Sequence, residues 1–433
     1  MAFYYTMDAD TEFSNKLIHE LILEHKKHIR EYQELQDMYW GNHKIFRQPH
    51  KEKYKPDNRL MVNFAKYIVD TFNGYFIGNP VSMTHEKEEV NNYLAFLDGY
   101  NDQADGNAEL SKICSIYGNG YELVFNDENS EIGITYMTPI EGFVIYDNTI
   151  QKKPLFGCHY GLNDDDIEVG YFYTKDTIYQ FINDNGGYRI YEETPNVFGE
   201  IPMIEYIENE ERQSIFANVK SLINAFNKAL SEKANDVEYY ADAYLKVLGA
   251  EIDEETLKTL RDSRIINVSG DDALTVEFMT KPNADTTQEN LLERLQKLIF
   301  EISMVANISD ENFASSSGVA LRYKLQSMDN LAKGKERKFQ SGLSRRYKVI
   351  SKFPTSKLAN DEWVGIKYKF SRNVPANLAE EADIAQKLSG IVSEETQVSV
   401  LSIVQNAKEE VKRKNEELEG NDEFTRTSEV ENG

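Results

Sequence analysis

The chain has 433 residues, with 48 Lys and Arg against 73 Asp and Glu, so its formal charge at pH 7 is −25. Hydrophobic residues make up 40% and charged residues 28%, an ordinary balance for a globular protein of about three domains. No apolar run approaches the ~18 residues that cross a bilayer, and Cys114 and Cys158 form no CxxC motif. The composition therefore excludes an integral membrane protein and a disulfide-rich miniprotein, and it predicts free thiols.

The sequence lacks the common motifs for catalysis and cofactor binding. Its nearest match to a phosphate-binding loop, Gly334-Lys335, has no first glycine and continues with Glu336 where a serine or threonine is required. A dinucleotide fingerprint that starts at Gly118 fails because Leu123 stands where the third glycine belongs. The Gly118 region instead predicts a turn that leads into a strand. We therefore expect no catalytic residues, no metal and no cofactor.

One acidic cluster leaves an enzymatic alternative open. Asp164–Asp166 could hold Mg²⁺ or Ca²⁺ in a cytosolic metal-dependent hydrolase or nuclease, because these ions prefer carboxylate oxygens. The cluster lacks the glycine and the glutamate of an EF-hand loop. Adjacent acids in a chain this acidic more often form a solvated loop.

The first half of the chain predicts helices followed by an antiparallel β region. Apolar periodicity predicts helices over residues 13–40, 63–75 and 86–117. On the first of them, His25 and its neighbouring histidines are expected to be solvated. From residue 121 to about 207 the period changes to two, and turn residues separate short runs of β-formers. These runs predict strands over residues 121–125, 132–136, 143–146, 155–160, 168–174, 188–191 and 201–206.

The middle of the chain predicts two long amphipathic helices around a small insert. Apolar residues three or four positions apart predict a helix over residues 215–247, which at 1.5 Å per residue is about 50 Å long. The insert is expected to hold a helix over 254–262 and strands over 264–268 and 274–278. The second amphipathic helix is predicted over 286–306. Such long helices do not fit inside a small domain.

The last part of the chain is predicted to be mainly helical. A loop rich in Ser and Asn, residues 307–318, precedes a long helix predicted over 319–353. Residues 362–370 alternate as a strand, and further helices are expected over 377–418. The polar, acidic end from residue 420 is expected to be disordered.

Basic residues are concentrated in residues 318–357, which hold 11 Lys or Arg and two acids. The local charge is therefore +9, and the rest of the chain carries −34. The basic helix could pack against acidic neighbours in the same fold or in an adjacent subunit. It could instead form a surface that faces phosphates. Composition alone favours the first interpretation.

Several short motifs follow one another in a fixed order along residues 60–400. They are Asn58-Arg59-Leu60, Asn63-Phe64, Asp70-Thr71, Gly74-Tyr75, Gly78-Asn79-Pro80-Val81, Tyr117-Gly118-Asn119-Gly120-Tyr121, Gly199-Glu200-Ile201-Pro202, Ile204-Glu205-Tyr206, Asn235-Asp236, Ala241-Asp242-Ala243-Tyr244-Leu245 and Ser317-Gly318-Val319-Ala320-Leu321. In this order they resemble the portal proteins of tailed bacteriophages, in the branch found in phages of Gram-positive hosts. Each motif is weak alone, and their shared order makes the resemblance specific.

The resemblance implies an α+β portal fold with a defined domain order. The implied parts are a wing (1–211 and 353–375), two stem helices (212–247 and 285–307), a clip (248–284), a tunnel loop (308–318), a long basic helix that links wing and crown (319–352), a helical crown (376–418) and an acidic tail (419–433). The stem helices support this independently. Their apolar stripes can be buried if they pack between neighbouring subunits of a ring.

The resemblance also implies partners and a location. It implies a homododecameric ring at one capsid vertex of the virion, assembled in the host bacterial cytoplasm. Double-stranded viral DNA would pass through the ring during packaging and ejection. The terminase large subunit would dock first and a head-completion or tail adaptor protein later, with major capsid and scaffolding proteins around the ring. A non-viral scaffold whose long helices bind other proteins is a further alternative.

Three groups of residues are the candidate sites. Those expected to face DNA from the tunnel loop are Ser309, Asn312, Ser315, Ser316 and Ser317. Those expected to contact phosphates are Arg322, Lys324, Lys333 and Lys335. Those expected to make subunit contacts along the stem are Val219, Phe226, Leu230, Leu295 and Ile302. The acidic remainder of the ring would repel DNA and let it slide.

Overall fold

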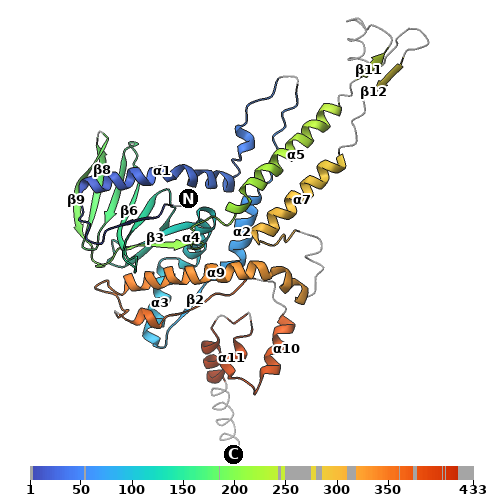
Figure 1. Ribbon diagram of the computed structural model, residues 1–433. Helices are drawn as coiled ribbons and strands as arrows, with labels where there is room; N and C mark the ends of the chain where they lie inside the picture. Colours follow the sequence, from blue (N-terminus) through green and yellow to red (C-terminus); the bar gives the residue numbers. More distant parts are fainter. Residues whose placement is uncertain are drawn as a thin grey trace, which may run out of the picture. The chain divides into compact units, whose positions relative to one another are not determined.

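The chain folds into two compact units (Figure 1), and each is described by itself. The first unit comprises Met1–Trp40, Lys66–Ala217 and Ser303–Gly433, and the second comprises Gly41–Ala65 and Asn218–Ile302. The computed structural model describes residues 3–52, 55–184, 186–241, 245–248, 275–278, 285–309, 318–359, 361–373, 378–401, 403–404 and 406–417. Within these residues, no helix is long and apolar enough to cross a membrane.

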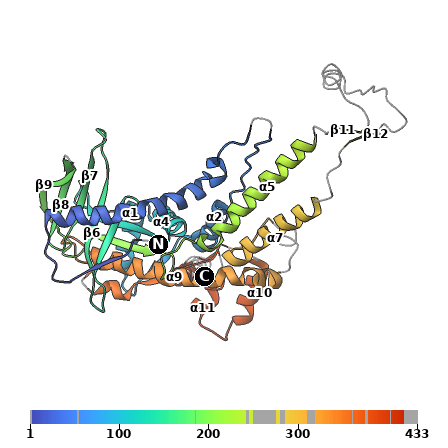
Figure 2. The ribbon, with the colours of Figure 1, turned by 45° about the horizontal axis from the view of Figure 1, so that its top comes forward.

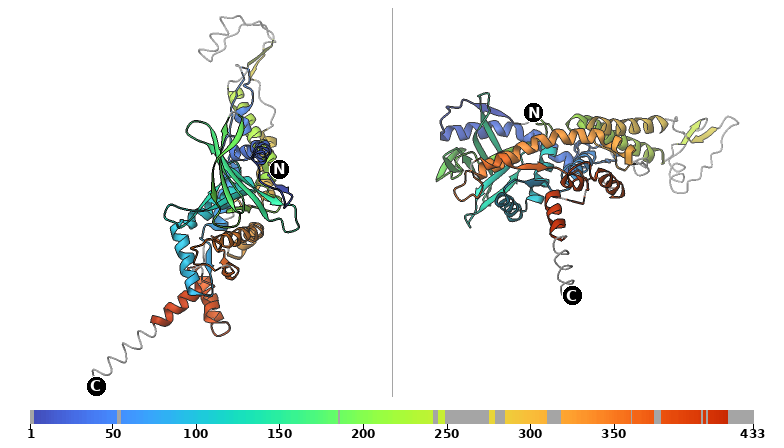
Figure 3. Two further views of the ribbon diagram at one scale, coloured as in Figure 1. Left: turned by 90° about the vertical axis from the view of Figure 1, so that its left-hand side faces the viewer. Right: turned by 90° about the horizontal axis from the view of Figure 1, so that it is seen from below.

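A six-stranded sheet and helix α1 (Asn15–Trp40) form one core of the first unit. The strand order is β1-β5-β6-β7-β8-β9, with β1 parallel to β5 and the other pairs antiparallel. Helix α1 lies across one face of this sheet (Figures 1 and 3). The strands are β1 (Tyr5–Met7), β5 (Gly142–Asp147), β6 (Pro154–Leu162), β7 (Glu168–Tyr173), β8 (Thr177–Asp184) and β9 (Gly187–Pro195).

A three-stranded sheet of order β10-β3-β4 forms the second core of this unit. Helix α9 packs against β10, where the rings of Tyr206 and Phe339 lie 4.9 Å apart. Gly118 ends α4 with a φ of 96°, and a Cβ there would lie 2.2 Å from the Arg212 carbonyl oxygen. The elements are α2 (Phe64–Ile77), α3 (Glu88–Tyr100), α4 (Gln103–Tyr117), β3 (Asn119–Asn126), β4 (Ile132–Met137), β10 (Met203–Ile207) and α9 (Gly318–Ile350).

Smaller elements complete the first unit. Strand β2 (Ser82–Thr84) pairs antiparallel with β13 (Lys367–Lys369). Towards the C-terminus, α10 (Leu378–Leu388), α11 (Glu394–Val398) and residues 407–417 are helical. The 3-10 helices are η1 (Lys44–Arg47, in the second unit), η2 (Ala217–Val219, at the border of the two units) and η3 (Glu362–Gly365).

The second unit is built on two helices that run side by side, α5 (Lys220–Ala241) and α7 (Asp285–Ser303) (Figures 1 and 2). The Asn58 and Leu60 backbone N–H groups donate to the side chains of Asn235 (2.6 Å) and Ser231 (2.9 Å), so this extended segment lies along α5. Residues 41–65 were expected in the wing, but they group with the two long helices. The unit also contains β11 (Leu245–Leu248), paired antiparallel with β12 (Thr275–Phe278).

Most predicted elements are confirmed, three are wrong, and three strands were not predicted. The helix predicted over 86–117 is two helices, because Asp102 adopts a left-handed φ of 48° between them. The helix predicted over 215–247 ends at Ala241, and Leu245–Leu248 is a strand instead. The strand predicted over 362–370 is a 3-10 turn followed by the short β13. Strands β1, β2 and β8 were not predicted. The elements predicted over 254–262 and 264–268 lie outside the described residues.

Candidate functional site

Two of the cations in α9 are buried within the first unit. The Lys335 side chain is 1% exposed, and its Nζ lies 2.6 Å from Glu208 Oε2. The same Nζ donates to the Ser111 carbonyl oxygen (2.8 Å) and to Ser115 Oγ (2.7 Å) at the C-terminal turn of α4. A cation is favourable there because a helix C-terminus carries partial negative charge. The expectation that Lys335 contacts phosphates is therefore corrected: its charge is used inside the fold.

Arg346 lies about three turns further along α9 and is also fully buried. Its Nε donates to Glu122 Oε1 at 2.8 Å, and its Nη2 donates to Glu122 Oε2 and to Asn107 Oδ1. Burial opposes the charge of Arg346, but the Glu122 carboxylate more than offsets burial and raises the pKa of the guanidinium. A bidentate pair of this kind fixes α9 on strand β3.

Further basic residues in and near α9 pair with acids near the surface of the same unit. Lys338 pairs with Glu210, while Arg345 and Lys348 both pair with Glu200. Burial acts to raise the pKa of Glu200, but Arg345 and Lys348 lower it overall. The interpretation that this helix packs against acidic neighbours of the same fold is thus confirmed for its second half.

In the first half of α9, Lys324 and Lys333 are exposed, unlike the buried Lys335 and Arg346 of the second half. Lys333 is exposed and pairs only one turn away, with Asp329 at 2.7 Å. Lys324 is exposed too, and so is Tyr323, at 73%. The side chain of Arg322 lies outside the described residues. Lys324 and Lys333 therefore remain surface candidates for phosphate contacts.

The expected tunnel loop is described only at its beginning. The Ile308 N–H donates to the Tyr67 hydroxyl at 3.0 Å, and the Ser309 Oγ lies 3.4 Å from the same oxygen. Ser309 is exposed. Helix α2 thus anchors the entry to this loop. The other four loop candidates, Asn312, Ser315, Ser316 and Ser317, lie outside the described residues.

The expected stem contacts divide into buried and exposed positions. Val219, Phe226 and Leu295 are 0%, 7% and 9% exposed within the single chain. Phe64 lies between Phe226 and Phe300, with ring centroids 5.0 and 5.8 Å away. The expectation that these three residues await a neighbouring subunit is corrected, because the chain buries them itself.

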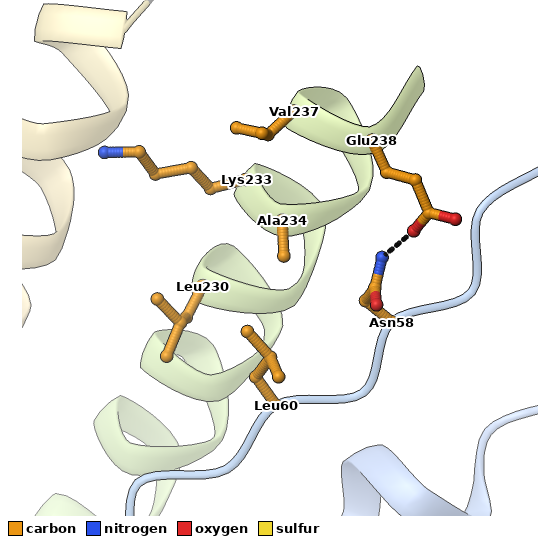
Figure 4. Close-up of a pocket in the computed structure, with 7 residues that line it drawn as sticks. All are labelled: Asn58, Leu60, Leu230, Lys233, Ala234, Val237 and Glu238. Atoms are coloured by element: carbon orange, nitrogen blue, oxygen red, sulfur yellow. Dashed lines mark hydrogen bonds between the residues drawn. The ribbon is translucent and has the colours of Figure 1, made fainter. Parts of the chain in front are cut away.

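Leu230 and Ile302 remain accessible. Ile302 is 45% exposed, and Leu230 is half-buried in the wall of a shallow groove of about 460 Å³ (Figure 4). Val237, 61% exposed, lines the same groove about two helical turns further along α5. The groove could not be predicted from the sequence. Its other wall is the extended segment at Leu60, whose position beside α5 no local pattern indicates.

The acidic cluster forms a turn in a hairpin. Asp164–Asp166 are exposed between β6 and β7, and Asn163 Oδ1 accepts the backbone N–H groups of Asp165 (3.1 Å) and Ile167 (2.9 Å). Among the described residues, no group of three or more His, Cys, Asp or Glu side chains could hold a metal ion.

His25 is a structural residue rather than a solvated one. It is 0% exposed, with Nδ1 at 2.7 Å from the Tyr160 hydroxyl and Nε2 at 2.8 Å from the Pro139 carbonyl oxygen. Burial lowers the pKa of His25 to about 4. The expectation of a solvated histidine was wrong because the partners come from β6 and from the turn before β5, far away in the sequence.

Comparisons with known proteins agree over most of the chain. Residues 18–423 match the model of the family described as "Phage portal protein, SPP1 Gp6-like". The chain is 25% identical to a portal protein of Bacillus phage SPP1 over 394 residues, which cover 84% of this chain and 77% of that protein. It is 25% identical to a portal protein of Clostridium phage phiCD119 over 363 residues, covering 78% and 79%.

A weaker likeness exists among solved structures. The neck of an empty GTA particle, computed with C6 symmetry, matches with a TM-score of 0.44 and 11% identity. The match covers 78% of this chain and 89% of that one.

Proposed function

The chain belongs to the phage portal proteins of the SPP1 Gp6-like family, and on that basis we propose that twelve copies form a closed ring at one capsid vertex. The family match over residues 18–423 is the observation that carries this proposal. In the ring, the first unit supplies the wing and the crown, and the second supplies the stem and the clip. Double-stranded DNA passes through the centre during packaging and ejection.

The ring is proposed to act as a docking platform in the virion. The terminase large subunit binds the clip during packaging in the host cytoplasm and hydrolyses ATP there, so this chain has no catalytic role. A head-completion or tail adaptor protein takes its place afterwards. Major capsid and scaffolding proteins surround the wing. The metal-dependent hydrolase is not retained, because neither the family match nor the exposed turn at Asp164–Asp166 supports it.

The net negative charge of the chain supports the proposal that DNA passes through the ring. Twelve copies at −25 each carry a formal charge of about −300, and DNA carries one negative charge per ~1.7 Å of its axis. A mostly acidic ring repels DNA and keeps it from adhering, so a few cations suffice to restrain it. Lys324 and Lys333 are exposed in the first half of α9, the half that follows the tunnel loop in the sequence, and we assign the restraining contacts to them and to loop residues such as Ser309.

DNA packaging with α9 variants tests the conduit. Lys324→Glu and Lys333→Glu together are expected to reduce the amount of DNA retained in filled capsids severalfold, because each adds a negative charge where the account places a phosphate contact. The matched control is Lys352→Glu, an exposed cation just beyond the C-terminal end of α9. Equal DNA retention in the double variant, the control and the parent would remove these contacts from the proposal.

Negative-stain microscopy of the purified chain tests the ring itself. Annular particles with a central hole are expected. A homogeneous population of compact single chains, with scaffolding and capsid proteins present, would contradict the portal assignment.

A further inference from the structure

The groove on the second unit is an open continuation of the packing between α5 and the extended segment before α2. Near the N-terminal end of α5, the Phe64 ring fills the space between Phe226 and Phe300. Further along α5 the corresponding space is the groove, whose apolar lining is Leu60, Leu230, Ala234 and Val237. Figure 4 shows Leu60 opposite Leu230 and Ala234, with no labelled side chain between them. Val237 is 61% exposed, so an apolar stripe on α5 ends in solvent.

Helix α7 has one broad apolar face, and part of it is buried within the chain. On the buried part, Leu292, Leu295 and Ile299 are 8%, 9% and 0% exposed. The second stripe, at the edge of that face, consists of Leu291, Leu298 and Ile302. Leu291 is 50% exposed, Ile302 is 45% exposed and Leu298 is half-buried. Single exposed apolar residues are ordinary on a surface, but three on one helical line are a candidate contact.

The second stripe lies on the opposite side of α7 from the groove. A helix turns by about 100° per residue, so Leu291, nine positions before Phe300, is rotated from it by about 180°. Leu298 and Ile302 lie within about 20° of that direction. Phe300 faces Phe64 and therefore marks the groove side of the helix pair. One unit thus presents an apolar groove on one side and an apolar ridge on the other.

We propose that the ridge of Leu291, Leu298 and Ile302 inserts into the groove of Leu60, Leu230, Ala234 and Val237 of a neighbouring copy. This proposal rests on the ring proposed above and specifies its subunit contact. The contact is heterologous, because two different surfaces meet head to tail. Repetition of such a contact closes into a ring when the rotation per copy divides a full turn.

A second copy is the occupant that the observations favour. The ridge and the groove belong to the same compact unit, so every copy supplies one of each. The groove rim carries Glu238, which accepts a hydrogen bond from Asn58 and is exposed, while the exposed Arg294 flanks the ridge one turn after Leu291. Opposite charges beside matching apolar surfaces set the register of a contact. A self-complementary surface would instead predict an isolated dimer.

Cysteine cross-linking within the full chain distinguishes these arrangements. In the variant Val237→Cys/Leu291→Cys, a short bis-maleimide reagent should join the groove of one copy to the ridge of the next. A denaturing gel should then show a ladder of trimers and larger species at more than ten times the level in either single variant. The native thiols of Cys114 and Cys158 are both 0% exposed and should not react. Val364→Cys/Leu291→Cys is the matched control, since Val364 is 69% exposed in the first unit.

Each outcome decides the proposal. A ladder in the double variant alone supports head-to-tail contact. Dimers in the Val237→Cys single variant, with no ladder in the double variant, would show a self-complementary contact and overturn the inference. Annular particles on the grid that yield no cross-linked ladder would also overturn it, while leaving the portal ring intact. Absence of annular particles from the unmodified chain would instead refute the proposed function.

Discussion

The two compact units of this chain use their residues for different ends. In the first unit, two basic residues of α9 form buried ion pairs with acids of the same unit: Lys335 with Glu208 and Arg346 with Glu122. In the second unit, apolar residues of α5 and α7 stay exposed along two lines, with Val237 on one and Leu291 on the other. A charge cluster in a sequence therefore need not mark a binding surface. The exposed apolar lines of the second unit are the stronger candidate for assembly.

The largest change in the free energy of unfolding should appear when one partner of a buried ion pair is removed. Lys335→Met leaves the Glu208 carboxylate 2% exposed and without its cation, which should lower the free energy of unfolding by about 3–5 kcal/mol. Adding Glu208→Gln should restore more than half of that loss. Lys338→Met is the control on the same helix, because its partner Glu210 is 73% exposed and such pairs contribute about 0–1 kcal/mol.

Denaturant unfolding at one fixed protein concentration measures these differences, since assembly also affects stability. Equal destabilisation by Lys335→Met and Lys338→Met would mean that the buried pair does not hold α9 on the first unit.

Acidification should weaken the first unit through His25. Its pKa is lowered to about 4 in the folded chain against 6.5 for the unperturbed group, so the unfolded chain binds the proton first as the pH falls. Stability is therefore lost between pH 6.5 and 4, by about 3 kcal/mol at 1.36 kcal/mol per pKa unit. His25→Gln keeps hydrogen-bonding groups near Tyr160 and should flatten this slope.

Asp98 should change stability with pH in the opposite direction, because burial raises its pKa to about 6. That carboxyl favours the folded state as the pH falls from 6 towards 3.8, so only the difference between parent and His25→Gln isolates the histidine. Parallel stability curves for the two proteins across pH 4–6.5 would contradict the buried, neutral His25.

A charge in the groove should act on assembly and not on folding. Val237→Asp replaces about 1.5–3 kcal/mol of apolar burial per subunit contact with a buried carboxylate, so the concentration needed for assembly should rise at least about tenfold. Val364→Asp, at a similarly exposed valine of the first unit, should leave assembly unchanged. Sedimentation over a concentration series measures both. An unchanged assembly concentration for Val237→Asp would place the subunit contact elsewhere.

The smallest effect is expected in the hairpin turn of the first unit. Replacing Asp164, Asp165 and Asp166 by Asn should change the free energy of unfolding by less than about 0.5 kcal/mol, because these side chains are exposed. Asn also tolerates the left-handed φ of 57° at Asp166. Unfolding with and without added Mg²⁺ provides the measurement. A Mg²⁺-dependent stabilisation of the parent that the variant loses would reopen the metal-site alternative.

Sequence periodicity predicted the elements whose pattern is local. Helix α1 and strands such as β3 and β6 follow the expected bounds within a few residues, because their apolar period reflects one buried face. The break at Asp102 and the strand Leu245–Leu248 were missed. Both lie in sequences whose apolar spacing also fits a continuous helix, and tertiary pairing decides between the alternatives.

The candidate residues were harder to predict, because their roles depend on distant partners. Lys335 has the same local sequence signature as Lys333, yet only Lys335 meets Glu208, 127 positions earlier in the chain. Val219, just before α5, and Val237, on α5, belong to the same apolar pattern in the sequence, but only Val219 is covered by the chain. Periodicity identifies an apolar face, whereas the packing of the whole chain determines which part of that face remains for a neighbour.

Native mass spectrometry of the unmodified full chain over a wide concentration range tests the central claim most directly. The account predicts a discrete oligomer of about a dozen copies that gains no further copies as the concentration rises, because a closed ring has no free groove or ridge. A single chain of 49.9 kDa at every concentration, or a series that grows without limit, would contradict closure through the second unit.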